Sequence, residues 1–279
     1  MEDIQQNTKS FQNQVSPIHK KFLELKSKDK FAFMPFLMAG DPSLEKTSHI
    51  LLELQKKGAD IIELGIPHSD PLADGPVIQL AASKAIKSGT SIEKVFDMLR
   101  GLKDKLHTPV VIFTYCNPLL SFGFERFCKE AQLVNVCGLV IPDLPLEEAD
   151  IFSEVAKSYF IDLVLLVAPT TPRERMIKIS QKSRGFLYLV SVTGVTGERE
   201  LIEDRVQRLL YELKEITSIP IVVGFGISSP KHVLKVRSWG ANGVIVGSAL
   251  VKRITNIEES KVVNEAGRLC EEFNQAAKQ

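Results

Sequence analysis

The chain has 279 residues, of which 44% are hydrophobic and 25% are charged, and its formal net charge is +1. These proportions are ordinary for a globular protein, and a near-neutral charge without a basic block argues against a nucleic-acid or membrane-surface partner. No apolar run approaches the ~20 residues needed to cross a bilayer, so we expect no membrane-spanning segment.

The N-terminal residues 1–16 are polar, contain no arginine and lack an apolar stretch. They match neither a secretory signal nor a transit peptide. We expect them to form a flexible extension, followed by an extra N-terminal helix at about Ile18–Ser27. No composition shift or linker divides the rest of the chain, so residues 17–279 are predicted to form one domain.

Short β-rich apolar runs then alternate with segments of helical periodicity. The eight runs are Phe31–Ala39, Asp60–Ile66, Pro109–Tyr115, Gly138–Pro142, Asp162–Ala168, Gly185–Ser191, Pro220–Gly226 and Gly243–Gly247. Their nearly continuous apolar interiors are typical of parallel strands that are buried on both faces. Eight strand–helix units predict an α/β fold, a single-domain (β/α)8 TIM barrel. An open doubly wound sheet is the alternative, but the first strand–helix turn, Ala39–Pro42, lacks the GxGxxG fingerprint of that fold.

The helical segments carry their own boundary signals. The helix after the first strand is predicted over Leu44–Lys57 with Ser43 as its cap, and Ser91 and Ser229 stand at the same position before two later helices. Gly58 follows the first helix directly before the second strand, where a left-handed glycine commonly ends a helix.

Active sites of TIM barrels lie at the C-terminal ends of the strands. In the second strand Glu63 is surrounded by apolar residues, so it is predicted to point into the barrel mouth, where burial raises its pKa into the range useful for proton transfer. A structural salt bridge is the alternative. The following loop carries Asp70 and Asp74, and Asp74 has two open roles, either in catalysis or as a cap of the helix that begins near Pro76.

Glycine-rich turns follow the last strands. The turns Gly224–Ser228 and Gly247–Leu250 each lead into a helix N-terminus, whose free N–H groups favour an anion. Because the turns after strands 7 and 8 form the usual phosphate site of these barrels, we predict a phosphate site here, with tight turns as the alternative. A third glycine-rich segment, Thr193–Gly197, is a candidate lid.

The remaining residue types narrow the chemistry. The cysteines have no CxxC pair and are predicted to be reduced core residues, which favours a cytoplasmic location and leaves a plastid stroma open; they are Cys116, Cys128, Cys137 and Cys270. No histidine or cysteine spacing predicts a metal site, no GxSxG elbow is present, and no lysine lies within an apolar strand. The pattern therefore favours acid–base catalysis by carboxylates on a phosphorylated substrate.

The segments Glu63–Pro76 and Gly194–Gly197 resemble the tryptophan synthase alpha chain family. The likeness extends from about Phe31 to Val251, through the Gly40–Pro42 turn and, further along, through Tyr115, Asn117, Ile141–Pro145, Tyr188, Gly224–Ser228 and Gly247–Ser248. The family cleaves indole-3-glycerol phosphate to indole and glyceraldehyde 3-phosphate without a cofactor. The resemblance thus implies a lyase of tryptophan biosynthesis.

The resemblance also implies roles for single residues. Glu63 would be the general acid–base, and Asp74 would bind the indole N–H. The substrate-binding residues would be Phe36, which lines the indole pocket, Tyr188, for which a core tyrosine is the alternative, and the phosphate ligands Gly197, Gly226, Gly247 and Ser248, with Thr196 beside them. His68 stands where the family carries phenylalanine or tyrosine, so we expect different local packing there.

A partner is implied as well. Family members pass indole to a beta subunit that holds pyridoxal phosphate, in an alpha2beta2 heterotetramer, and the partner surface would include Asp70, Pro71 and Asn117. Three rival functions remain open at this stage. They are another phosphosugar barrel (an isomerase or decarboxylase), a free-standing lyase that releases indole, and a non-catalytic regulatory subunit.

Overall fold

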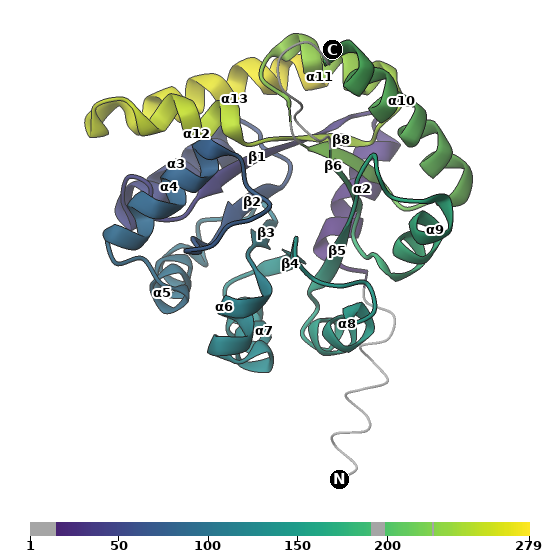
Figure 1. The fold of residues 1–279 in the computed structure, drawn as a ribbon. Helices are drawn as coiled ribbons and strands as arrows, with labels where there is room; N and C mark the ends of the chain where they lie inside the picture. The colour runs from purple at the N-terminus through teal and green to yellow at the C-terminus, as the bar shows by residue number, and fades with distance from the viewer. Residues whose placement is uncertain (1–14, 191–198, 225) are drawn as a thin grey trace.

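In the computed structural model, residues 15–190, 199–224 and 226–279 are described, with residues 199–203 described by their backbone alone. Eight parallel strands form a closed barrel in the order β1 to β8, with β8 paired to β1. The strands are β1 (Ala32–Met38), β2 (Ile62–Gly65), β3 (Val110–Phe113), β4 (Val136–Val140), β5 (Asp162–Val167), β6 (Leu187–Val190), β7 (Ile221–Gly224) and β8 (Gly243–Val246). The predicted barrel is confirmed (Figure 1).

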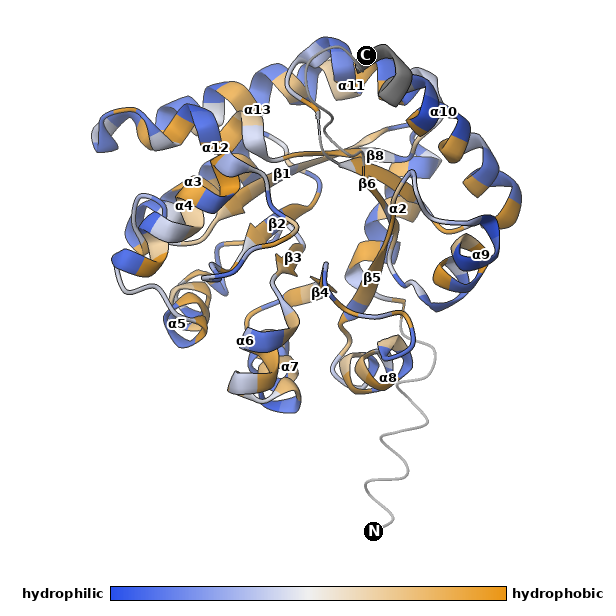
Figure 2. Ribbon diagram, in the orientation of Figure 1, coloured by the Kyte–Doolittle hydropathy of each residue, from blue (hydrophilic) through white to orange (hydrophobic). Residues whose placement is uncertain are grey.

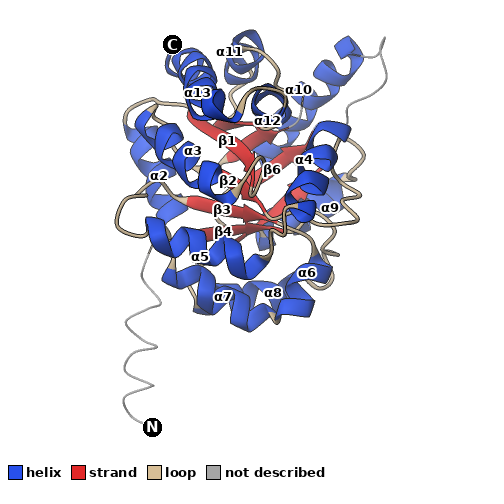
Figure 3. Cartoon of the chain, turned by 90° about the vertical axis from the view of Figure 1, so that its left-hand side faces the viewer, coloured by secondary structure: helices blue, strands red, loops and turns tan. Residues whose placement is uncertain are grey.

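Helices follow the strands and surround the barrel (Figure 3). They are α2 (Pro17–Ser27), α3 (Leu44–Lys56), α4 (Pro76–Lys87), α5 (Ile92–Leu102), α6 (Cys116–Phe122), α7 (Phe124–Leu133), α8 (Ala149–Ser158), α9 (Arg173–Lys182), α10 (Arg199–Ile216), α11 (Pro230–Ser238), α12 (Ser248–Thr255) and α13 (Val262–Lys278), with a 3-10 turn at Glu259–Lys261. None of the helices in the described ranges is long and apolar enough to span a membrane.

The strand side chains alternate between two apolar layers. In β1, Met34 and Phe36 belong to the cluster inside the barrel, whereas Phe33 and Leu37 belong to the cluster between the strands and the helices. Both layers are apolar, which explains why the strands read as continuous apolar runs. Figure 2 shows the same division, with the helices hydrophobic toward the strands and hydrophilic on the outside.

The predicted extra helix is α2, which closes the N-terminal end of the barrel. Its Ile18 and Phe22 belong to the inner cluster, and the Phe22 ring centroid lies 6.0 Å from that of Phe186. Ser16 fixes the start of the helix, because its hydroxyl accepts from the His19 N–H (3.1 Å) and donates to the Asp162 carboxylate at the start of β5 (2.5 Å). Of the predicted flexible extension, residues 1–14 lie outside the described residues.

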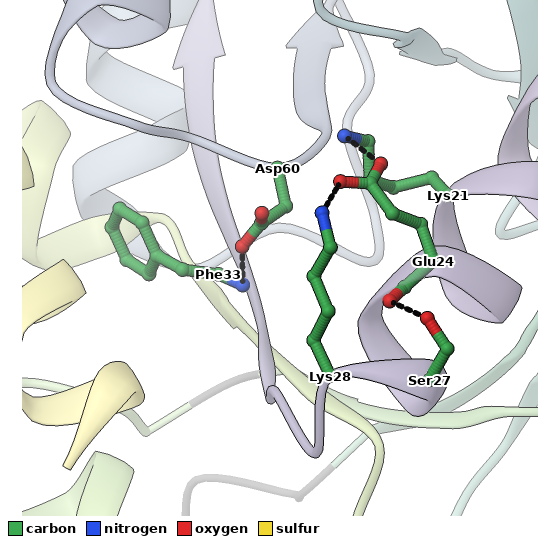
Figure 4. A network of polar contacts seen from close by, with 6 residues as sticks. All are labelled: Lys21, Glu24, Ser27, Lys28, Phe33 and Asp60. Carbon is green, nitrogen blue, oxygen red and sulfur yellow. Dashed lines mark hydrogen bonds and ion pairs between the residues drawn. The ribbon is translucent and has the colours of Figure 1, made fainter.

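Polar contacts brace the same end of the barrel (Figure 4). The Asp60 carboxylate, just before β2, accepts from the Phe33 N–H of β1 at 2.9 Å. Glu24 of α2 pairs with Lys21 and Lys28 on the surface. These contacts fix α2 and the start of β2, whereas the active sites of TIM barrels lie at the opposite, C-terminal end of the strands.

The predicted serine caps hold with one difference. Ser43 and Ser91 each accept the expected backbone hydrogen bond, from Lys46 and Lys94. Ser229 precedes α11 as predicted, but its hydroxyl makes no capping bond. Strand β4 begins at Val136, two residues before the predicted Gly138, because Val136 pairs with Val110 at a register irregularity of β3. Such an irregularity cannot be derived from composition.

The four cysteines are all free, and three of them are buried. Burial raises the pKa of each thiol above its ordinary value, to about 12 for Cys128 and Cys270, because the core disfavours the thiolate. Three of them are therefore core residues as predicted, whereas Cys116 is only half-buried at the start of α6.

Candidate active site

The C-terminal ends of the strands bring several predicted residues together. Phe36 of β1 lies opposite Glu63 of β2 in the sheet register, and Glu63 lies opposite Val111 of β3. Tyr188 lies in β6, and the turns with Gly226 and Gly247 follow β7 and β8. Because all eight strands are parallel, these residues share one end of the barrel. Thr196, Gly197 and the lid predicted at Thr193–Gly197 lie outside the described residues.

Glu63 is a buried carboxylic acid. Its exposed fraction is 1%, and its Oε1 has no hydrogen-bond partner among the described residues. Burial raises the pKa of Glu63 from 4.5 to about 8, and the nearby charge of Asp74 adds to this, whereas a hydrogen bond from Tyr188 acts in the opposite direction. Glu63 makes no ion pair, so the structural salt-bridge alternative fails for the described residues. A carboxyl group with this pKa exchanges a proton near neutral pH.

Asp74 is the second carboxylate at the mouth. It lies two residues before α4, whose cap is Gly75 without any side-chain capping bond, so Asp74 does not cap that helix. Burial raises its pKa from 3.8 to about 6, and a hydrogen bond with Tyr115 opposes this increase. Asp74 is therefore more easily ionised than Glu63, and the two acids carry different charges between pH 6 and 8.

Tyr115 holds the loop that carries Asp74. Its hydroxyl accepts from the Ala73 N–H at 3.1 Å and donates to the Asp74 carboxylate, while the Asp74 N–H donates to Pro71 O at 3.0 Å. Tyr115 is one of the residues that carry the resemblance to the family, but the sequence alone gave it no role. Its position at the end of β3 was the available signal, because the ends of barrel strands point toward the mouth.

Aromatic rings form one wall of the mouth. The Phe36 and Phe113 centroids are 5.9 Å apart, those of Phe113 and Tyr115 are 6.1 Å apart, and those of Tyr115 and His68 are 5.3 Å apart. The His68 ring thus packs on the Tyr115 ring, with the two planes tilted by 37°. A Cβ on Gly65 would lie 2.7 Å from Phe36 Cζ, so glycine leaves the space for this ring.

Tyr188 is buried and donates a hydrogen bond to Glu63. Burial, together with the charges of Glu63 and Asp74, raises the pKa of Tyr188 well above 10, so it stays a neutral donor. A Cβ on Gly224 of the neighbouring strand would overlap the Tyr188 ring. Gly224 is therefore required to let Tyr188 reach Glu63, a role that the sequence motif did not suggest.

The turns after β7 and β8 present backbone groups at the mouth. Gly226 has a φ of +76° and is exposed, and Ser248, the first residue of α12, is also exposed. Strands β7 and β8 are paired, which places these two turns side by side. Backbone N–H groups of a glycine turn and of a helix N-terminus are suited to bind a phosphate.

The predicted partner surface lies on the rim of the same mouth. Asp70 and Asn117 are exposed, and Pro71 is half-buried. Two large apolar side chains adjoin them, Leu72 with 82% and Leu120 with 62% of the side chain exposed. Leu72 directly follows Pro71, and Leu120 lies in α6 with Asn117; the sequence analysis did not single them out.

Comparisons with known proteins agree with this geometry. The sequence profile of the family described as "Tryptophan synthase alpha chain" matches residues 22–278. The tryptophan synthase alpha chain of Prochlorococcus marinus subsp. pastoris is 64% identical over 265 residues, with 95% of each chain covered. The crystal structure of tryptophan synthase subunit alpha from Legionella pneumophila gives a TM-score of 0.86 at 34% identity, with 95% of this chain and 99% of that chain covered. A chain of the tryptophan synthase complex from Pyrococcus furiosus gives 0.82 at 38% identity, with 88% and 99% covered.

Proposed function

The chain belongs to the tryptophan synthase alpha chain family, whose alpha reaction cleaves indole-3-glycerol phosphate to indole and glyceraldehyde 3-phosphate, and we propose that Glu63 and Asp74 perform this cleavage. The observation that carries the proposal is the pair of carboxyl groups at the mouth, Glu63 buried and Asp74 half-buried, with separated pKa values of about 8 for Glu63 and about 6 for Asp74. Near neutral pH one acid holds a proton and the other holds a charge.

Glu63 moves the proton. In its neutral form it donates a proton to C3 of the indole ring, which leaves Glu63 as a carboxylate and places positive charge on the ring. The carboxylate then takes the proton of the side-chain hydroxyl as the bond between C3 and the hydroxyl-bearing carbon breaks. The electron pair of that bond restores the aromatic ring, and the hydroxyl-bearing carbon becomes the aldehyde of glyceraldehyde 3-phosphate. Glu63 ends protonated, ready for another turnover.

Asp74 stabilises the charge that this step creates. Its carboxylate accepts a hydrogen bond from the indole N–H and lies beside the positive charge that develops when C3 gains a proton. Tyr115 holds the Asp74 loop in place, and Tyr188 orients Glu63. Preorganised charge in a water-poor site is most effective because the protein need not reorganise during the reaction.

The rest of the substrate fits the remaining features of the mouth. Phe36 and its aromatic neighbours form the wall for the indole ring. The backbone N–H groups of Gly226, Gly247 and Ser248 bind the phosphate, supported by Thr196 and Gly197 from the segment that lies outside the described residues.

The partner is a tryptophan synthase beta subunit in an alpha2beta2 heterotetramer. Exposed Leu72 and Leu120 support docking at the rim that includes Asp70, Pro71 and Asn117. One of the structural relatives is itself a tryptophan synthase complex. The pyridoxal phosphate belongs to the beta subunit, and the chemistry above needs no cofactor in this chain. Four free cysteines fit a reducing cytoplasm, and the catalytic domain includes Ser16, whose hydroxyl binds the Asp162 carboxylate of β5.

The test is to incubate the purified chain with indole-3-glycerol phosphate, alone and with a tryptophan synthase beta subunit, and to follow glyceraldehyde 3-phosphate through a coupled dehydrogenase. We expect slow cleavage by the chain alone and at least about tenfold faster cleavage with the beta subunit, because docking closes the rim loops. Fast cleavage that the beta subunit leaves unchanged would identify a free-standing lyase. Stimulation of the beta subunit without cleavage would identify a regulatory subunit.

A further inference from the structure

His232 contacts the turn that follows β7, although the proposed chemistry assigns it no role. It is the third residue of α11, and its ring reaches back along the chain. Its Nδ1 lies 3.3 Å from Ser228 N, 3.4 Å from Ser228 Oγ and 3.1 Å from Gly226 O. One ring nitrogen therefore meets two donors and one acceptor of the same turn.

Either state of this nitrogen holds the turn. As an acceptor, Nδ1 accepts a hydrogen bond from the Ser228 N–H or from the Ser228 hydroxyl. As a donor, it donates its N–H to Gly226 O. The third helical residue often has this task, since a glutamine or glutamate there commonly accepts from a free N–H at the start of its helix. His232 reaches one residue further back, and the Ser229 hydroxyl makes no capping bond.

The contacted turn is also the one that needs a support. Gly226 is exposed and adopts a φ of +76°, and glycine is the residue with the greatest backbone freedom. A phosphate is bound by backbone N–H groups only when those groups are held in one orientation. A loose glycine turn would lose part of its binding energy in becoming ordered.

We propose that His232 is a positioning residue that fixes the Gly226–Ser228 turn for the phosphate of the substrate. This inference rests on the phosphate site of the proposed function. His232 does not touch the reacting carbon atoms and acts through the backbone of the turn, so its loss weakens binding of the ground state and the transition state alike. Such a loss raises KM and leaves kcat unchanged.

The test compares His232→Leu, which has no polar atom, with His232→Gln, which keeps both an acceptor and a donor. We expect His232→Leu to raise KM for indole-3-glycerol phosphate about tenfold at unchanged kcat. A tenfold change corresponds to the loss of about one hydrogen bond. The KM of His232→Gln should stay within about twofold of the wild-type value, because glutamine is a common capping residue at the third position of a helix. His49→Leu, a histidine on the exposed face of α3, is the matched control and should change neither constant.

Binding of inorganic phosphate, measured directly by calorimetry, separates this inference from the proposed function. We expect the wild type and His232→Gln to bind phosphate and His232→Leu to bind it about tenfold more weakly. Failure of the wild type to bind would overturn the phosphate site itself. Equal binding by the wild type and His232→Leu, or an equal loss in His232→Leu and His232→Gln, would overturn the role of His232 alone. Thermal unfolding of each variant checks that it is folded.

Discussion

Glu63→Gln abolishes cleavage of indole-3-glycerol phosphate while the substrate still binds; this is the largest effect that the structure predicts. The amide has nearly the same shape as the acid, but it neither gives a proton to C3 nor takes one from the hydroxyl. General acid–base catalysis contributes about 10²–10⁴-fold for one proton transfer, and Glu63 performs two. We therefore expect kcat to fall by at least about 10⁴-fold. A single-turnover assay measures the loss, and equilibrium binding of the substrate should change little, because the aromatic wall and the phosphate turns are unaltered.

Two controls accompany this variant. Tyr188→Phe removes the neighbouring hydroxyl but keeps the acid, so it should retain measurable cleavage.

The stability of the folded protein gives the second control. Burial raises the pKa of Glu63 from 4.5 to about 8, so the folded protein holds the proton more tightly, and wild-type stability falls as pH rises through that window. Glu63→Gln removes this loss and should be more stable than the wild type above pH 8, by roughly a few kcal/mol. Near-normal turnover in the glutamine variant would refute the mechanism.

Asp74→Asn is expected to lower kcat by about 10²–10³-fold, which is the usual loss when one preorganised electrostatic contact is removed. The amide oxygen still accepts from the indole N–H, so substrate binding should survive, but the negative charge that stabilises the protonated ring is gone. Steady-state kinetics with the isolated chain measures the effect. The matched control is Asp70→Asn, which changes an exposed aspartate of the same loop and should leave cleavage by the isolated chain unaltered. Equal losses in both variants would place the effect in loop folding.

The sequence was sufficient for those parts of the fold and the site that follow from local patterns. Eight continuous apolar runs predict eight strands because a parallel barrel strand is buried on both faces. Glu63 stands out for the same reason, since a carboxyl group in such a strand has only the barrel interior to face. The cap at Ser43 depends on residues three positions apart, and the structure confirms it.

Contacts between residues far apart in the sequence could not be predicted from such local patterns. Tyr115 reaches the Asp74 loop only because β2 and β3 are neighbours in the closed barrel. Gly224 leaves space for the Tyr188 ring only because β6 and β7 are neighbours in the barrel. His232 falls in a helical segment whose surface residues look alike in sequence, and its contact with the glycine turn depends on how the chain enters α11.

The pH dependence of kcat/KM for cleavage of indole-3-glycerol phosphate tests the account most directly, because it reports the essential acid and base of the free enzyme. With the pKa of Glu63 raised to about 8 and that of Asp74 to about 6, we predict a bell-shaped profile with its maximum between these values. The rate should fall above pH 8, as Glu63 loses the proton it must give to C3, and below pH 6, as Asp74 loses its charge. A rate that keeps rising through pH 8 toward pH 10 would contradict the assignment of Glu63 as the proton donor.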